Sequence, residues 1–199
     1  MRNVVAQALE QAALAAQAMA SDTNLIDSVV RAGTYLADAL RAGNHVFSCG
    51  NGGSMSDAMH FAEELSGKFR EERAPLPAVA ISDPAHLSCV ANDYGYDHVF
   101  SRFIQAHAQP GDILLAISTS GKSPNVLKAA GAAWAKGAKV IALTGKKDSL
   151  LSRLCDVEIC THMTGSPWSD RIQELHIKVI HTLIELVEYS IFEKPSHPT

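Results

Sequence analysis

Positive charge is scarce in this sequence. The 199 residues include 17 Lys and Arg against 21 Asp and Glu, which gives a formal net charge of -4. The nearest basic cluster is the pair Lys146 and Lys147, and two residues cannot follow a phosphate backbone. We therefore expect no nucleic-acid partner.

Long apolar runs are also missing. No stretch approaches the roughly 18 apolar residues that a membrane-spanning helix needs. The Ala-rich segment at residues 4–20 is interrupted by Gln and Glu side chains, which a signal peptide would not carry in its apolar core. We expect an amphipathic helix there, no membrane association and a cytoplasmic location.

Cysteine is sparse, and the four thiols form no recognisable motif. Cys49, Cys89, Cys155 and Cys160 show neither a C-x-x-C pair nor zinc-finger spacing, as expected of a reduced intracellular protein. Internal repeats, low-complexity tracts and linkers are absent as well. We expect a single domain over residues 1–199, with residues 194–199 as a frayed tail.

Short apolar runs alternate with helical patterns from residue 45 onward. The runs are residues 45–49, 77–81, 113–117, 139–143 and 157–160. The helical patterns cover residues 3–20, 25–41, 54–65, 84–91, a segment from Pro124, and 170–192. Continuously apolar strands separated by helices are typical of parallel strands covered on both faces. The fold class predicted is a three-layer α/β sandwich with a parallel sheet and extra N-terminal helices.

One loop after a predicted strand has the composition of an anion site. Residues 118–123 supply four hydroxyl groups, a glycine and Lys122 directly before a helix. Ser123 can be the N-cap and Pro124 the first helical residue, so amide groups and the helix dipole would face an anion. A polar loop with a good cap is the alternative, but the density of hydroxyls favours phosphate binding.

A glycine-rich loop follows the first predicted strand, at residues 50–54. The dinucleotide fingerprint would require a glycine at Met55, and a P-loop would require Gly-Lys followed by Ser or Thr. Glycines let a ligand approach the backbone closely. A tight strand-to-helix turn explains this loop equally well.

The helix after that loop carries an apolar and a polar stripe. Its apolar positions recur at helical spacing and should face the core: Met55, Ala58, Met59, Ala62 and Leu65. Asp57, His60 and Glu64 form a polar stripe beside them. His and Glu at i and i+4 can hold one metal ion, although the residues alone favour an ordinary surface pair.

Two further polar pairs are ambiguous by themselves. Gln173 and His181 lie eight residues apart in the last helix, a rise of about 12 Å. They can therefore serve one small site only from its opposite ends, or serve sites in different subunits. Asn92 and Asp93 precede Tyr94 and Gly95, which reads first as a turn.

Taken together, the motifs resemble the phosphoheptose isomerase family. They lie at residues 48–54, 57–65, 89–93, 117–121 and 170–181, and the resemblance extends to about residue 186. The family belongs to the sugar-isomerase (SIS) fold group, whose fold is a five-stranded parallel sheet flanked by helices. The resemblance implies that fold here, with helices 1–42 packing on the domain and in an oligomer.

The resemblance also implies an activity and a set of site residues. The activity is the interconversion of sedoheptulose 7-phosphate and D-glycero-D-manno-heptose 7-phosphate, the first step toward the activated heptose of lipopolysaccharide core or other surface glycans. A homotetramer with interfacial active sites and one Zn²⁺ per subunit is implied. Glu64 would be the catalytic base and His181 the acid. The metal ligands would be His60, Glu64, Gln173 and His181. The substrate contacts would be Asn51, Gly52, Gly53, Glu64, Asn92, Asp93, Ser118, Thr119, Ser120, Ser123 and Gln173.

Some residues depart from the family pattern, and three other functions compete, one of them a related isomerase that acts on a different ketose phosphate. Met55, Ser56, Lys122 and Pro124 differ from the usual residues, but none of them replaces an expected ligand. A non-catalytic SIS-fold adaptor that binds a replication initiator is the main alternative. That branch alters the carboxylate and histidine positions, whereas Glu64 and His181 both stand here. A sugar-phosphate sensor of a transcription regulator would need a DNA-binding module, for which 199 residues leave no room.

Overall fold

Five parallel strands form one sheet in the computed structural model, which describes residues 1–162 and 168–192. The strands are β1 (Val46–Cys49), β2 (Ala78–Ala80), β3 (Ile113–Ser118), β4 (Lys139–Thr144) and β5 (Val157–Cys160). Their order across the sheet is β2-β1-β3-β4-β5, and every neighbouring pair is parallel. The predicted α/β class and five-stranded parallel sheet are confirmed. The tail predicted at residues 194–199 lies outside the described residues.

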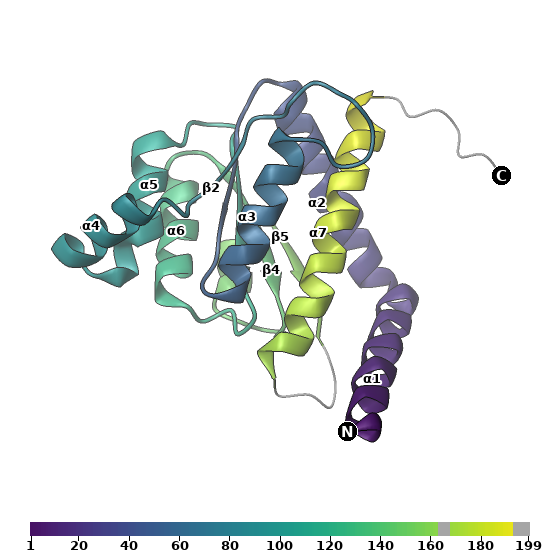
Figure 1. The fold of residues 1–199 in the computed structure, drawn as a ribbon. Coiled ribbons are helices and arrows are strands. Elements are labelled where there is room, and N and C mark those ends of the chain that lie inside the picture. The colour runs from purple at the N-terminus through teal and green to yellow at the C-terminus, as the bar shows by residue number, and fades with distance from the viewer. Residues whose placement is uncertain (163–167, 193–199) are drawn as a thin grey trace.

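Helices connect and cover the strands (Figure 1). They are α1 (Arg2–Ser21), α2 (Thr23–Arg41), α3 (Gly53–Ser66), α4 (Pro84–Tyr94), α5 (Val99–His107), α6 (Pro124–Ala135) and α7 (Ser169–Phe192), with short 3₁₀ turns η1 (Tyr96–His98) and η2 (Leu151–Leu154). The sequence did not predict α5. The predicted turn at Asn92 and Asp93 is wrong, because α4 runs through both residues to Tyr94 and is followed by Gly95, whose φ is +86°.

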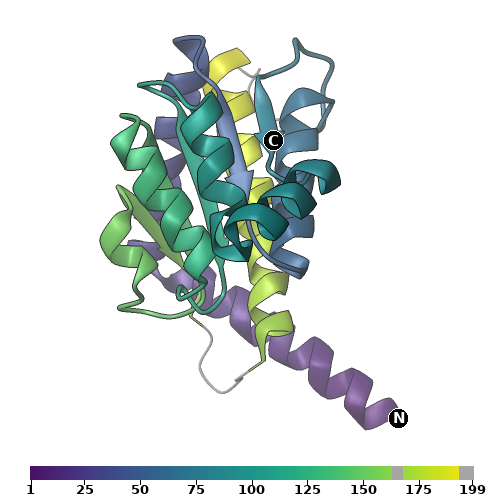
Figure 2. The same cartoon turned by 90° about the vertical axis from the view of Figure 1, so that its left-hand side faces the viewer.

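Alternate strand residues feed two separate cores, one on each face of the sheet. Ile113 and Leu115 join α2, α3 and α7 on one face, while Leu114 and Ala116 join α4, α5 and α6 on the other. Figures 1 and 2 show the sheet between these two groups of helices. The structure is therefore the three-layer sandwich that the continuously apolar strands predicted.

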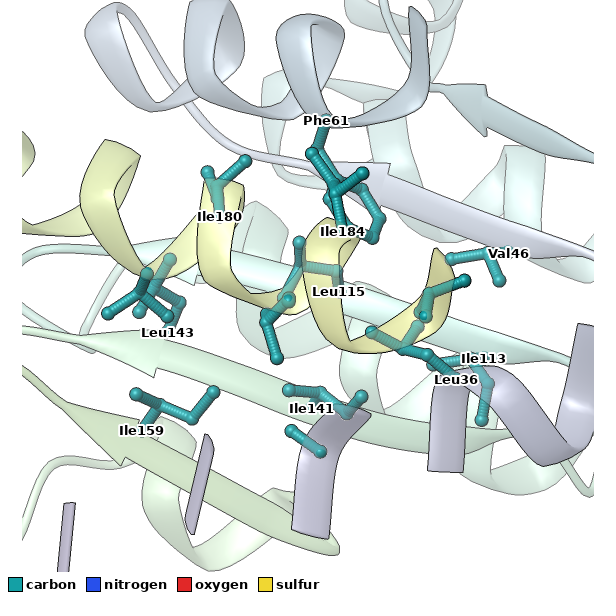
Figure 3. Packing of buried hydrophobic residues seen from close by; sticks show 14 of the residues in the cluster. Leu36, Val46, Phe61, Ile113, Leu115, Ile141, Leu143, Ile159, Ile180 and Ile184 are labelled. Atoms are coloured by element: carbon teal, nitrogen blue, oxygen red, sulfur yellow. The ribbon is translucent and has the colours of Figure 1, made fainter. Parts of the chain in front are cut away.

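The face covered by α3 and α7 is the one that positions the site. Phe61 of α3 and Ile180 and Ile184 of α7 pack above Leu115 and Leu143 of the sheet (Figure 3). The fully buried positions of α3, namely Ala58, Phe61 and Leu65, are three and four residues apart, as a helical stripe requires. The prediction that Met59 faces the core is wrong, since it lies beside this stripe and is 48% exposed.

The first helix extends away from the sandwich. Among its side chains, all within the described range, Ala15 is the buried one. Val4, Val5, Leu9 and Leu14 are each at least 60% exposed. Figures 1 and 2 both show its N-terminal end projecting beyond the rest of the chain. In the described part of the chain, no helix combines the length and apolarity needed to cross a membrane.

His176 of α7 is buried in the protein interior and should make the free energy of unfolding depend on pH. The side chain is fully buried, and among the described residues neither ring nitrogen makes a hydrogen bond of good geometry, although the Thr144 backbone lies close enough to act on the ring. Burial lowers the pKa of His176 to about 4, against a smaller opposing effect of the Thr144 backbone. The folded chain therefore holds a neutral imidazole at pH values where the unfolded chain is already protonated.

We predict that stability is lost as pH falls from about 6.5 to 4, by up to about 3 kcal/mol from this residue alone. His176→Leu should lose less stability over that window, because it has no proton to gain on unfolding. Urea unfolding of both proteins at pH 7 and pH 4.5, at one protein concentration, measures the difference. Identical losses in the two proteins would contradict this assignment.

Candidate active site

A cavity lies at the carboxyl end of the sheet, where the strand order reverses. β1 is flanked by β2 on one side and β3 on the other, so the loops after β1 and β3 lead to opposite faces. Ligands of open parallel sheets bind at this switch point. The cavity measures about 390 Å³ and is lined by Asn51, Gly52, Gly53, Ser54, Ile117, Ser118, Thr119, Ser123, Ser169 and Gln173.

The loop after β3 presents its hydroxyls at the start of α6. Ser123 is the N-cap and Pro124 the first helical residue, as the sequence predicted. In the described structure, however, the Ser123 hydroxyl does not cap the helix, and its Oγ lies 3.1 Å from Ser118 Oγ. Gly121 donates its N–H to Ser118 Oγ at 3.1 Å. Asn125 Oδ1 accepts the Val126 N–H in the first turn at 3.0 Å, so the Ser123 hydroxyl stays beside the cavity at the positive dipole end of α6.

The loop after β1 is held by an amide pair that the sequence analysis missed. Asn51 and Asn125 exchange two side-chain hydrogen bonds of 2.9 and 2.8 Å. Tyr96 also donates its hydroxyl to Asn51 Oδ1 at 3.2 Å. Asn125 is buried in the first turn of α6, next to the predicted anion loop, and that position was the available signal. The pair ties the two cavity loops together.

A second cluster lies on the facing sides of α3 and α7. His60 Nε2 is 2.9 Å from His181 Nε2 and 3.5 Å from Glu64 Oε1. Each of the three residues offers a ligand atom, and these atoms lie within 4.8 Å of one another. The i and i+4 pair on α3 is therefore not an ordinary surface pair, because α7 brings His181 against it.

A neighbouring carboxylate orients the first imidazole. His60 Nδ1 lies 3.1 Å from Glu63 Oε1, so we assign the ring proton to Nδ1. The Nε2 lone pair then points toward Glu64 and His181. Such a carboxylate behind a histidine is the usual support of a metal-binding imidazole. Sequence reasoning missed Glu63, although its spacing of three residues from His60 made the contact available.

Gln173 lies with the cavity and not with this cluster. Its Nε2 is 3.5 Å from Ser54 Oγ, and its amide lies so close to Gly53 that a Cβ there would be 2.6 Å from Nε2. Gly53 is two helical turns before His60, as Gln173 is before His181. The two helices therefore run in the same direction. Of the four predicted metal ligands, one chain brings together three.

Three other predicted substrate residues are exposed and lie outside the lining of the cavity. Asn92 and Asp93 are exposed on the last turn of α4 and hydrogen bond to each other at 2.7 Å. Ser120 is exposed, and its hydroxyl accepts the Lys122 N–H at 3.3 Å. None of the three is among the residues that line the described cavity.

Burial and charge shift the protonation of two groups near the cluster. Partial burial lowers the pKa of His181, the His60 ring lowers it further, and Glu64 opposes both. Burial raises the pKa of Asp57 to about 6, while His60 acts in the opposite direction. His181 is thus a neutral imidazole at pH 7, with a lone pair or an N–H to offer.

Comparisons with known proteins agree with this geometry. A model of the SIS domain family matches residues 9–145. The phosphoheptose isomerase of Pectobacterium atrosepticum is 53% identical over 187 residues, which cover 94% of this chain and 96% of that protein. The phosphoheptose isomerase of Yersinia pestis is 58% identical over 167 residues, which cover 84% and 86%. The chain belongs to the phosphoheptose isomerase family. The solved structure of the family member from Neisseria gonorrhoeae superposes with a TM-score of 0.86 at 36% identity, covering 94% of this chain and 98% of that one.

The cluster of this phosphoheptose isomerase family member fits a zinc ion. In a tetrahedral zinc site the ligand atoms lie about 3.3 Å apart, since each is about 2.0–2.1 Å from the metal. The separations of 2.9 and 3.5 Å within the cluster lie on either side of that value. Two imidazoles and a carboxylate are also the donor set of catalytic zinc sites that keep one position open.

We predict that Gly53→Ala weakens anion binding in the cavity without unfolding the chain. The new Cβ would displace the flexible Gln173 amide, whereas the φ of Gly53 lies outside the left-handed region. Affinity for inorganic phosphate should fall about fivefold, as for the loss of one hydrogen bond. Isothermal titration calorimetry gives this affinity. The control is Gly131→Ala in α6, where a Cβ meets nothing within 4 Å, and its affinity should be unchanged.

Proposed function

We propose that this chain interconverts sedoheptulose 7-phosphate and D-glycero-D-manno-heptose 7-phosphate. The observation that carries the proposal is the Glu64 carboxylate of α3 beside the His181 imidazole of α7. The first turns of the same two helices line the cavity proposed to bind the phosphate. The family relatives support it, since the Pectobacterium and Yersinia proteins bear the isomerase name. They give no support to the replication-initiator adaptor. The proposed role in the cell is the first step toward activated heptose for surface glycans.

The isomerisation requires one carboxylate and one acid–base partner. Glu64 removes a proton from C1 of the ketose while His181 donates its proton to the C2 carbonyl oxygen, which forms an enediol. His181 then takes the proton from the C1 hydroxyl, and Glu64 returns its proton to C2. Both residues end in their starting states, and the reverse sequence converts the aldose into the ketose.

Glu64 can serve as a base although it belongs to the metal-binding cluster. Its Oε1 faces His60 Nε2, and the carboxylate is 17% exposed at the edge of the cluster. A carboxylate bound tightly to zinc through both oxygens would be a poor base. We therefore propose that Oε1 faces the metal and that the second oxygen moves the proton.

The phosphate is proposed to bind at the other end of the substrate, in the cavity of the two loops. Ser118, Thr119 and Ser123 supply hydroxyls there, and the N-terminus of α6 supplies a positive dipole end. Ser120, Asn92 and Asp93 are proposed contacts at the rim. A fixed phosphate end also positions the carbonyl end of the substrate beside Glu64 and His181. Proton transfer then takes place within one bound complex and needs no further encounter.

The metal, the assembly and the location complete the proposal. His60, Glu64 and His181 would hold one Zn²⁺ per subunit, and the bound ion would polarise the substrate carbonyl as a Lewis acid. Gln173 lies two turns away in the same chain, so it could join that ion only from a second copy. A cytoplasmic homotetramer is proposed, and the exposed apolar side chains of α1 offer one surface for it.

We predict that Glu64→Gln lowers turnover by at least about 100-fold while the chain stays folded. General acid–base residues contribute about 10²–10⁴-fold, and kcat should fall by that factor because the amide cannot accept the proton. Proton NMR of purified protein with sedoheptulose 7-phosphate and added zinc measures the rate, and circular dichroism checks the fold.

The matched control is Glu72→Gln, a carboxylate on the exposed loop after α3. It should keep the wild-type rate. Absence of turnover by the zinc-supplied wild type would overturn the proposed activity.

A further inference from the structure

A buried ion pair joins the ends of the two helices that carry the cluster. Arg73 lies in the loop between α3 and β2, yet its side chain is only 4% exposed. Its Nε donates to Glu188 Oε1 of α7 at 2.7 Å, and the Glu188 side chain is 3% exposed. Two desolvated charges are costly unless their remaining groups are satisfied. The other donors of Arg73 therefore matter.

Those donors go to the last turn of α3. Arg73 NH2 donates to the Glu64 carbonyl at 2.7 Å, and NH1 donates to the Leu65 carbonyl at 2.9 Å. The final carbonyls of a helix have no partner within it, and a cation there also complements the helix dipole. Arg73 thus acts as a C-terminal cap of α3, and one of the two residues it caps is Glu64.

Glu188, the acidic partner of the ion pair, lies on the same helix as His181. Glu188 follows His181 by seven residues, which places both on one side of α7 about two turns apart. Gly53 lies against Gln173, His60 against His181, and Arg73 against Glu188 along the parallel helices. An exposed ion pair of Arg70 and Glu185, at 2.6 Å, lies between the last two contacts. Of the two ion pairs beyond the cluster, Arg73 with Glu188 is the buried one.

We infer that Arg73 and Glu188 are positioning residues, which hold the Glu64 turn of α3 at a set distance from His181. The catalytic part of this inference rests on the proposed function, whereas the geometric part does not. The planar guanidinium can contact a carboxylate and two carbonyls at once, because its five N–H donors lie in one plane and point in different directions. A lysine ammonium at this position keeps the charge but cannot span all three acceptors.

Arg73→Lys and Glu188→Gln test the inference in the full-length chain. Both should lower Zn²⁺ affinity about 10–100-fold, the usual cost of removing support behind metal ligands. The kcat for sedoheptulose 7-phosphate should fall by a similar factor while KM stays within about twofold, since the phosphate cavity lies at the opposite end of the helices. Chelator competition measures the affinity, and steady-state kinetics measures kcat and KM.

Val187→Ala is the matched structural control. Val187 is fully buried next to Glu188 on α7, so its truncation lowers thermal stability without touching the ion pair. At an equal loss of Tm it should keep zinc affinity and kcat within about twofold of the wild type. The inference is overturned if all three variants lose zinc affinity in proportion to their loss of Tm.

Ring signals of the histidines separate this inference from the proposed function. In ¹⁵N-histidine spectra of the metal-free protein, the His60 and His181 signals should move in Arg73→Lys and Glu188→Gln but not in Val187→Ala. If the wild type turns nothing over yet these shifts occur, the proposed function fails and the positioning role stands. If turnover is normal and the signals stay in place, the positioning role fails and the function stands. A variant that does not fold leaves the other charge-pair variant to decide.

Discussion

The parallel packing of α3 and α7 on one face of the sheet is the constraint on which the site depends. Phe61 and Leu65 of α3 share one core with Val179, Ile180 and Ile184 of α7. Side chains in such a core interlock at near-crystalline density, so the helices cannot slide past each other by a residue. A slip of one residue would rotate a side chain by about 100° around its helix. His181 would then turn away from His60 and Glu64. The apolar stripe thus determines which polar atoms meet.

Sheet topology supplies the second half of the site by an independent route. β1 and β3 are neighbours in the sheet although β2 lies between them in the sequence. The loop after β1 enters α3 and the loop after β3 enters α6, on opposite faces of the sheet. Their first residues meet over the strand ends, where Asn51 and Asn125 hydrogen bond. α3 therefore begins at the cavity and ends beyond the cluster, and α7 runs beside it from Gln173 to Glu188.

Much of this arrangement could be predicted from the sequence, because the signals are local. Continuously apolar runs identified the five strands, and Ser123 with Pro124 marked the start of α6. Tertiary contacts decided the rest. Taken by themselves, His60 and Glu64 indicated a surface pair, and only the family resemblance linked them to His181, because no spacing within one helix reveals which helix lies opposite. The same limit applies to the strand order.

The errors have physical causes as well. Met59 is apolar, which predicted a buried position, but its place on the helix lies beside the buried stripe and leaves it 48% exposed. Asn92 and Asp93 have strong turn propensity, yet α4 continues through them to the glycine that can adopt a positive φ. Asn125 and Arg73, which act by supporting other residues, gave no motif because their partners lie on other elements.

The projecting helix α1 has a consequence for how this protein responds to dilution. Four of its apolar side chains, Val4, Val5, Leu9 and Leu14, are at least 60% exposed in the single chain and add little to its stability. If copies of the chain cover them in the proposed tetramer, the free energy of burial becomes available only through association. Folding and assembly are then linked by mass action, and the unfolding temperature rises with protein concentration. The same twenty-residue helix would make the enzyme most fragile where it is most scarce.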